Sequence, residues 1–229
     1  MNRSRHQEVQ FKVNNVVWQT LTFIRNSMSN GSLKSKHWRG VRLGVNIPSH
    51  ATPRRSQPLA MTITWKPPDQ PWLKLNTDGS FNESNGKAGG GCLIRDHSGR
   101  LMVAFALPLT AHSVLEAELL AMHHGLVMAK ELAKPIWLEA DAEQAIKLVE
   151  GKEWGHAHIR RTMVHLALHK WHLTLRTTFI NREGNKAADL LVKMGLELSD
   201  RQVWDAQAAP RGLKDIIRME QMGIPNIRV

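Results

Sequence analysis

Residues 72–80 read Trp-Leu-Lys-Leu-Asn-Thr-Asp-Gly-Ser, a strand-like run that ends in an acidic residue and a turn pair. Asp78 closes this run, although Asp-Gly is also one of the commonest turn pairs. Glu118 lies in the first turns of a predicted helix, Asp141 ends a short apolar run, and Asp189 lies in a late predicted helix. If these four carboxylates met at one place, they would suit a hard divalent cation such as Mg²⁺.

The hydrophobic pattern around these residues predicts an α/β domain that begins with an antiparallel β-meander. A glycine-rich lead over residues 86–91 precedes the second strand. The expected strands are 72–78, 92–95, 100–106, 136–140 and 173–180, and the expected helices are 113–133, 142–150, 159–169 and 184–194. This order predicts a mixed five-stranded sheet with helices on both faces.

The composition divides the chain into three parts. Residues 1–63 are expected to be a basic N-terminal arm and linker, because the stretch from 29 to 68 is rich in Ser, Gly, Pro and Arg. Residues 64–199 are expected to form the domain. Residues 200–229 are expected to be a tail with a weak helical signal over 212–221.

The net charge of +11 is concentrated at the N-terminus. Residues 1–60 carry ten Lys/Arg and one Glu, whereas residues 61–200 carry 16 basic and 16 acidic side chains. Such an arm suits phosphate backbones, since counterion release drives sequence-independent binding to nucleic acid. Two other interpretations stay open, a solubilising tail and an organelle-targeting leader that is rich in Arg and poor in acid.

The bulk composition excludes several classes of protein. Cys92 is the single cysteine, which excludes an internal disulfide framework and a cysteine-rich zinc module. No apolar stretch reaches the ~20 residues that span a bilayer, and no signal peptide is visible. We therefore expect an intracellular protein of the nucleus or cytoplasm with no membrane partner and no obligate protein partner. Organelle targeting by the arm is the alternative.

Some of these residues have ordinary structural explanations. Asp141, with Gln144 three residues later, fits an N-cap and capping box for the helix that follows. Asp189, taken alone, would be an exposed helix residue.

Other features invite a functional interpretation but favour a structural one. His165 and His169 have the i, i+4 spacing of a transition-metal pair, but without a clearly spaced third ligand a solvated helix face is expected. Trp171 lies beside predicted elements, and we expect it in the core.

Five motifs follow one another in chain order. They are Asn76-Thr77-Asp78-Gly79-Ser80, Ile94-Arg95-Asp96-His97-Ser98-Gly99, Ala117-Glu118-Leu119, Glu139-Ala140-Asp141 and Arg182-Glu183-Gly184-Asn185-Lys186-Ala187-Ala188-Asp189. With these motifs, the stretch from about Trp65 to Ser199 resembles a type 1 ribonuclease H domain, in the form common in plant retroelement-derived proteins.

The resemblance implies a ribonuclease H-like fold and hydrolysis of the RNA strand in RNA–DNA hybrids. It implies that two Mg²⁺ ions, with Mn²⁺ as an alternative, bind the catalytic carboxylates of Asp78, Glu118, Asp141 and Asp189. Gly79 and Ser80 would lie near the scissile phosphate. The other residues expected to contact nucleic acid are Asn185, Arg160 and Arg161.

Three departures from bacterial-type members keep an alternative open. Val114 and Leu115 occupy the positions of asparagines that help to read the 2′-hydroxyl. No histidine occurs between His172 and Asp189, and no basic handle is apparent apart from a stripe that includes Arg160, Arg161, Lys170 and Arg176. The alternative is a catalytically weak or inactive ribonuclease H-fold protein that binds nucleic acid, whereas retention of all four carboxylates favours the enzyme.

Overall fold

The computed structural model describes residues 61–153 and 155–228. They belong to one unit that begins at Ala60. The expected basic arm, except for its last residues 61–63, lies outside the described part of the chain.

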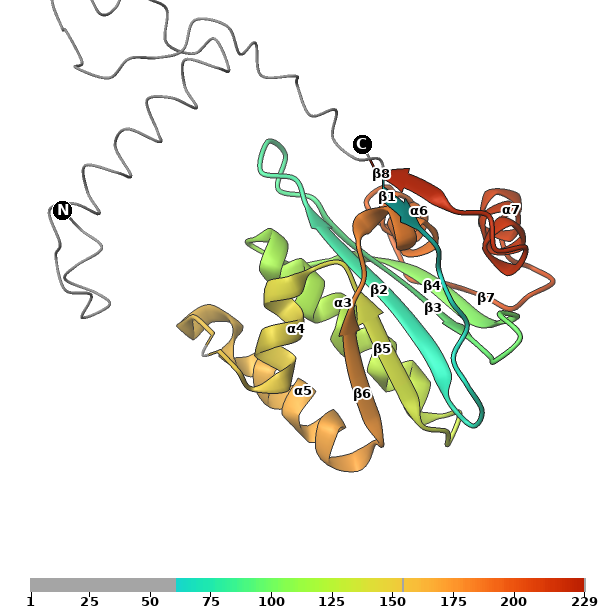
Figure 1. Cartoon of the computed structure of the whole chain (residues 1–229). Coiled ribbons are helices and arrows are strands. Elements are labelled where there is room, and N and C mark those ends of the chain that lie inside the picture. Colours follow the sequence, from blue (N-terminus) through green and yellow to red (C-terminus); the bar gives the residue numbers. More distant parts are fainter. Residues whose placement is uncertain (1–60, 154, 229) are drawn as a thin grey trace, which may run out of the picture. The chain divides into compact units, whose positions relative to one another are not determined.

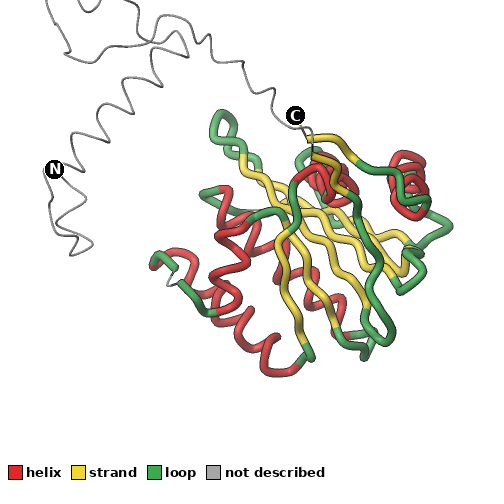
Figure 2. The backbone as a smooth tube through the Cα atoms, in the orientation of Figure 1, coloured by secondary structure: helices red, strands yellow, loops and turns green. Residues whose placement is uncertain are grey.

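A six-stranded mixed sheet forms the centre of the described domain (Figures 1 and 2), in the order β6-β5-β2-β3-β4-β7. β2, β3 and β4 are antiparallel neighbours, β5 runs parallel to β2, and β6 runs parallel to β5. The strands are β2 (Leu73–Phe81), β3 (Ala88–Arg95), β4 (Leu101–Leu109), β5 (Ile136–Ala140), β6 (Leu175–Phe179) and β7 (Gln202–Trp204). The α/β class and the mixed sheet are therefore confirmed, and the five expected strands are all present.

The sixth strand corrects the expected strand count, and it also changes the interpretation of residues 200–229. β7 pairs with the outer edge of β4, with Val203 opposite Phe105. After it, α7 (Arg211–Gln221) buries Leu213 and Ile217. β8 (Asn226–Arg228) then pairs antiparallel with β1 (Met61–Ile63) in a separate two-stranded sheet. Three-residue strands are too short to show an alternating pattern, which explains why a tail was expected here.

Helices cover both faces of the sheet (Figure 1). One face carries α3 (Val114–Lys130), α4 (Glu143–Glu150) and α5 (Arg160–His172), and the other carries α6 (Lys186–Gly195) and α7. Because side chains alternate along a strand, Cys92 and Ile94 of β3 join the first core whereas Leu93 joins the second. None of the described helices is both long enough and apolar enough to cross a membrane.

The glycines of β3 are part of the strand rather than a lead into it, because they pair with β2 on one side and β4 on the other. α6 packs directly on the backbone of Gly89 and Gly91. A Cβ on Gly91 would lie 2.5 Å from the Val192 nitrogen and 2.8 Å from the Ala188 oxygen. A residue larger than glycine would therefore push α6 away from the sheet. This contact fixes the position of the helix that carries Asp189.

Trp171 is on the surface, contrary to the expectation that it lies in the core. Its side chain is 86% exposed, and Val164 and Leu168 on the same helix are also exposed. Positions 164, 168 and 171 repeat at helical spacing, so they share one outward face of α5.

Candidate metal centre

Three carboxylates meet near the C-terminal ends of β2 and β5, two neighbouring parallel strands in the interior of the sheet. One oxygen from each of Asp78, Glu118 and Asp141 lies within 4.8 Å of the others. The parallel pairing of Thr77 with Ala140 explains two of them, since the next residue in each strand direction is an aspartate at the same end. Glu118 comes from the second turn of α3, which packs on β2.

The backbone of Gly79 connects two of these carboxylates. Its N–H donates to Asp78 Oδ1 at 2.9 Å and to Glu118 Oε2 at 3.1 Å. A Cβ at Gly79 would lie 2.4 Å from the Ala117 carbonyl carbon, so only glycine allows α3 to approach β2 this closely. The Asp-Gly pair is therefore not a turn here, because both residues lie inside β2.

The position of Gly79 also bears on the expected phosphate contact. Its N–H already has two carboxylate acceptors, so it is not free to donate to a scissile phosphate. Ser80 follows in the same strand, opposite Gly89, and is partly exposed.

The crowded carboxylates hold protons more tightly than isolated ones. Burial, together with the charges of Asp141 and Asp189, raises the pKa of Asp78 to about 7. Burial and the charge of Asp78 likewise raise the pKa of Glu118 well above its ordinary value. A divalent cation would relieve this repulsion, and an all-carboxylate donor set is one that Mg²⁺ and Mn²⁺ accept. The residues present therefore fit a hard divalent cation.

Asp141 does not cap the helix that follows it, so the capping-box hypothesis is wrong. The N-cap of α4 is Ala142, which makes no side-chain cap hydrogen bond. Asp141 Oδ1 instead accepts a hydrogen bond of 2.8 Å from Asn185 Nδ2. A long-range partner thus replaces the local one and holds the carboxylate toward Asp78.

Asn185 is buried among hydrogen-bond partners, and its expected contact with nucleic acid stays a prediction. It is 2% exposed, and its Nδ2 also donates to the Thr77 oxygen at 2.9 Å. Its Oδ1 lies 3.4 Å from Asn76 Nδ2. Both ends of the amide are thus engaged inside the protein, and one of its partners is the Asp141 carboxylate.

A buried polar network beside the site is the feature that sequence reasoning missed. Lys74, Asn76 and Asp78 alternate along β2, so they project from one face of the sheet. Lys74 Nζ lies 3.1 Å from Glu139 Oε2, and Asn76 Nδ2 lies 3.2 Å from Glu139 Oε1. The signal was present in the sequence as the polar residues Lys74, Asn76 and Asp78 at every second position of a buried strand.

Asp189 stands next to the three-carboxylate cluster but is not part of it. Its Oδ1 lies 3.3 Å from Arg182 Nη2, and its Oδ2 lies 2.6 Å from Lys193 Nζ. Its charge still raises the pKa of Asp78, so it acts on the site electrostatically. Three of the four predicted carboxylates thus come together, and a metal-binding role for Asp189 stays a prediction.

Some side chains of α5 are exposed to solvent, and others contact α3. Arg160 and Arg161 are exposed in its first turn. His165 and His169 are partly buried against α3, where His169 Nε2 lies 3.1 Å from His123 Nδ1 and the His165 ring centroid lies 5.0 Å from that of His123. The expected solvated histidine face is therefore a helix–helix contact.

Comparison with known proteins relates the chain to one family. A family model described as reverse transcriptase-like matches residues 76–195, a little over half of the chain. A protein from Arabidopsis thaliana, provisionally named a ribonuclease H protein, is 29% identical over 165 residues, covering 70% of this chain and 26% of the relative. The chain therefore spans about a quarter of the length of that relative.

Solved structures of ribonucleases H1 share the fold. RNase H1 from Halobacterium salinarum is 20% identical, with a TM-score of 0.52 over 55% of this chain and 98% of the other. LC11-RNase H1, solved in complex with an RNA/DNA hybrid, is 20% identical, with a TM-score of 0.51 over 55% of this chain and 96% of the other. Likeness at this identity establishes the fold alone, and the expected ribonuclease H-like fold is confirmed.

Proposed function

Because the chain is a ribonuclease H domain protein of the reverse transcriptase-like family, we propose that it is a divalent-metal-dependent endonuclease. Its proposed reaction is hydrolysis of the RNA strand in RNA–DNA hybrids. The observation that carries the proposal is the convergence of Asp78, Glu118 and Asp141 at one end of the sheet. Asp78 and Glu118 are buried and Asp141 is partly buried, so a bound cation would offset the cost of holding these like charges together.

In this proposal Asp78, Glu118 and Asp141 hold the metal, and Asp189 is the expected fourth ligand. Two bound Mg²⁺ ions, or Mn²⁺ in their place, would activate a water and stabilise the leaving 3′ oxygen. Because their pKa values are raised, Asp78 and Glu118 retain protons that cation binding would release, so cation affinity should increase with pH.

The surrounding residues have separate tasks. Gly79 N–H keeps the Asp78 and Glu118 carboxylates together, and Asn185 holds the Asp141 carboxylate. The side chains of Arg182 and Lys193 are 77% and 66% exposed, respectively, so they can turn from Asp189 to a phosphate oxygen when a substrate arrives. That exchange would free Asp189 for the metal.

Capture of the substrate would use positive charge outside the carboxylate cluster. We assign this role to Arg160 and Arg161, which are exposed on α5, and to the basic arm of residues 1–60. A nuclear or cytoplasmic location and a retroelement origin complete the proposal, with organelle targeting as the alternative role of the arm.

A second candidate function is nucleic-acid binding without efficient cleavage. Two observations favour it. The carboxylate of Asp189 is bonded to two cationic side chains, and Val114, where bacterial-type members have an asparagine, is 51% exposed at the start of α3. Such a protein would hold a hybrid in the same place but turn it over slowly.

A cleavage assay distinguishes the two functions. The full chain is incubated with a hybrid labelled on its RNA strand, and with matched RNA and DNA duplexes, in Mg²⁺, Mn²⁺ or EDTA. We expect metal-dependent cuts in the RNA of the hybrid alone, lost in Asp78→Asn and Asp141→Asn. Asp200→Asn, at an exposed position, is the matched control and should cut normally. Hybrid binding by the wild type without cuts in either metal would favour the second function.

A further inference from the structure

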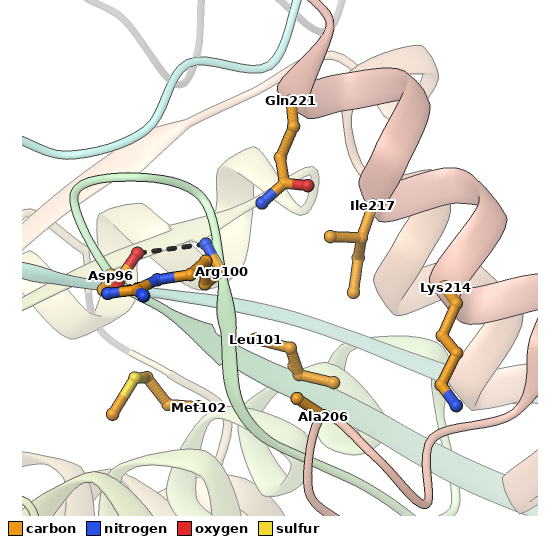
Figure 3. Close-up of a pocket in the computed structure, with 8 residues that line it drawn as sticks. All are labelled: Asp96, Arg100, Leu101, Met102, Ala206, Lys214, Ile217 and Gln221. Carbon is orange, nitrogen blue, oxygen red and sulfur yellow. Dashed lines mark hydrogen bonds and ion pairs between the residues drawn. The ribbon is translucent and has the colours of Figure 1, made fainter.

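The C-terminal helix lies outside the family match of residues 76–195, yet it is tightly packed on the domain. In the described structure α7 lies over the turn between β3 and β4, beside a hollow of about 380 Å³ (Figure 3). Ile217 and Leu101 line this hollow, and Gln221 Nε2 reaches the Ser98 oxygen at 3.4 Å. None of the residues that line the hollow belongs to the carboxylate cluster. Ile217 and Gln221 place α7 along one side of the hollow.

Glu220, in the last turn of α7, has its carboxylate in the protein interior. Glu220 is 5% exposed and forms an ion pair with Arg95, which is 1% exposed. Burial of both charges is costly, and apolar residues of similar size would often be at least as stable. The pair is therefore better explained by the geometry that it imposes than by a contribution to stability.

Arg95 transmits this geometry to β2. Its Nη2 donates to Asn76 Oδ1 at 2.8 Å, and its guanidinium carbon lies 3.4 Å from the centre of the Trp65 ring. Trp65 Nε1 donates to the same oxygen of Asn76 at 3.0 Å. Two donors at one end of the amide fix its orientation, so Nδ2 of Asn76 must point the other way.

The fixed amide of Asn76 then faces the candidate metal centre. Its Nδ2 approaches Asn185 Oδ1 at 3.4 Å, and Asn185 Nδ2 donates to Asp141 Oδ1 at 2.8 Å. A continuous series of polar contacts thus runs from α7 through β3 and β2 to a carboxylate of the cluster. Asn76 Nδ2 also lies 3.2 Å from Glu139 Oε1, so the series joins the buried network of β2.

We propose that Glu220 and Arg95 are positioning residues, which orient the Asp141 carboxylate toward the cation through Asn76 and Asn185. This inference rests on the proposed function insofar as the cation serves catalysis. It makes the C-terminal segment part of the functional unit, although the segment lies beyond the residues that the family model matches. Partners of metal ligands commonly change metal affinity 10–100-fold when they are removed.

Cation binding by the full chain, without substrate, tests the proposal directly. Mn²⁺ affinity is measured by calorimetry for the wild type, Glu220→Gln and Arg95→Lys, with folding checked by circular dichroism and melting temperature. Arg95→Lys keeps the charge but cannot reach Glu220 and Asn76 with one planar fork. We expect the dissociation constant for Mn²⁺ to rise about tenfold in each folded variant. Asp215→Asn, on the exposed side of the same helix, is the matched control and should bind as the wild type does.

The outcomes separate this inference from the proposed function. Weaker Mn²⁺ binding in the variants supports positioning even if the wild type cuts no hybrid, and in that case only the nuclease proposal fails. Where the variants do cut, the Mg²⁺ concentration for half-maximal rate should rise while KM for the hybrid stays unchanged. Unaltered Mn²⁺ affinity in folded Arg95→Lys or Glu220→Gln overturns the inference. A loss of Mn²⁺ affinity that is fully accounted for by the fraction of unfolded protein also overturns it.

Discussion

Replacing Asp78 by asparagine should abolish cleavage and yet stabilise the metal-free protein. Burial and neighbouring charges raise the pKa of Asp78 from 3.8 to about 7. Below pH 3.8 the carboxyl is protonated in both the folded and the unfolded state, and it makes no difference to stability. Between pH 3.8 and about pH 7 the carboxyl is ionised in the unfolded chain but still protonated in the folded one, so the free energy of unfolding falls as the pH rises.

The size of the effect follows from the shift. About three pH units at about 1.36 kcal/mol each give at most roughly 4 kcal/mol above pH 7. The side chain is only 8% exposed, so solvent screening removes little of this energy. An asparagine at this position carries no charge at any pH. We therefore expect Asp78→Asn to gain up to about 4 kcal/mol at pH 8 and nothing near pH 3.5.

Urea unfolding in EDTA, followed from pH 3.5 to 8.5, measures this difference. Mg²⁺ should reverse the order at high pH, because a ligand of the folded state stabilises the wild type more than the variant. Asp215→Asn serves as the control, since its carboxylate is exposed and its profile should follow the wild type. An Asp78→Asn protein that is less stable than the wild type at pH 8 in EDTA would refute the crowding argument, and so would a gain independent of pH.

Three further predictions concern other parts of the chain. Gly79→Ala should lose at least about 1–3 kcal/mol of stability and lose cation binding, because the new Cβ would lie 2.4 Å from the Ala117 backbone. Thermal melts compare this variant with Gly212→Ala, whose Cβ would have no neighbour closer than 3.5 Å. Equal stability of the two variants would contradict the close packing at Gly79. Deleting residues 1–60 should weaken hybrid binding and flatten its salt dependence in fluorescence anisotropy, and an unchanged slope would assign the arm elsewhere. Burial lowers the pKa of His123 and His169 below 6.5, so the free energy of unfolding should fall as the pH drops through 6.5. Urea titrations at pH 5–7.5 should show a weaker pH dependence for His169→Asn. An unaltered pH dependence would contradict this assignment to His169.

Much of the fold could be read from the chain because its central elements have strong local patterns. The apolar run 136–140 is a strand within the same bounds, and the helix expected at 113–133 is α3 with Ser113 as its N-cap. Two aspartates were predictable at one end of the sheet since each ends a strand that is buried and parallel to its neighbour. In these elements, local pattern and tertiary packing favour the same structure.

The remaining features depend on contacts that no local pattern contains. The glycines of β3 carry no hydrophobic signal, and their place in the strand follows from pairing with β2 and β4 and from the packing of α6 on Gly91. Asp141 has a good local capping partner in Gln144, but Asn185, 44 residues away, provides the hydrogen bond. Glu220 meets Arg95 across 125 residues of chain, so its burial could not be inferred from an amphipathic stripe.

The pairing of β1 with β8 has a mechanical consequence for the whole unit. Met61 lies opposite Arg228, so the two ends of the described domain are held next to each other by a ladder of only three residue pairs. Tension applied across these ends would open that ladder from its outer pair inward, one rung at a time, before any strand of the large sheet is loaded. The helix that supplies Glu220 is the next element along the peeled chain, and the force would detach it from Arg95 first.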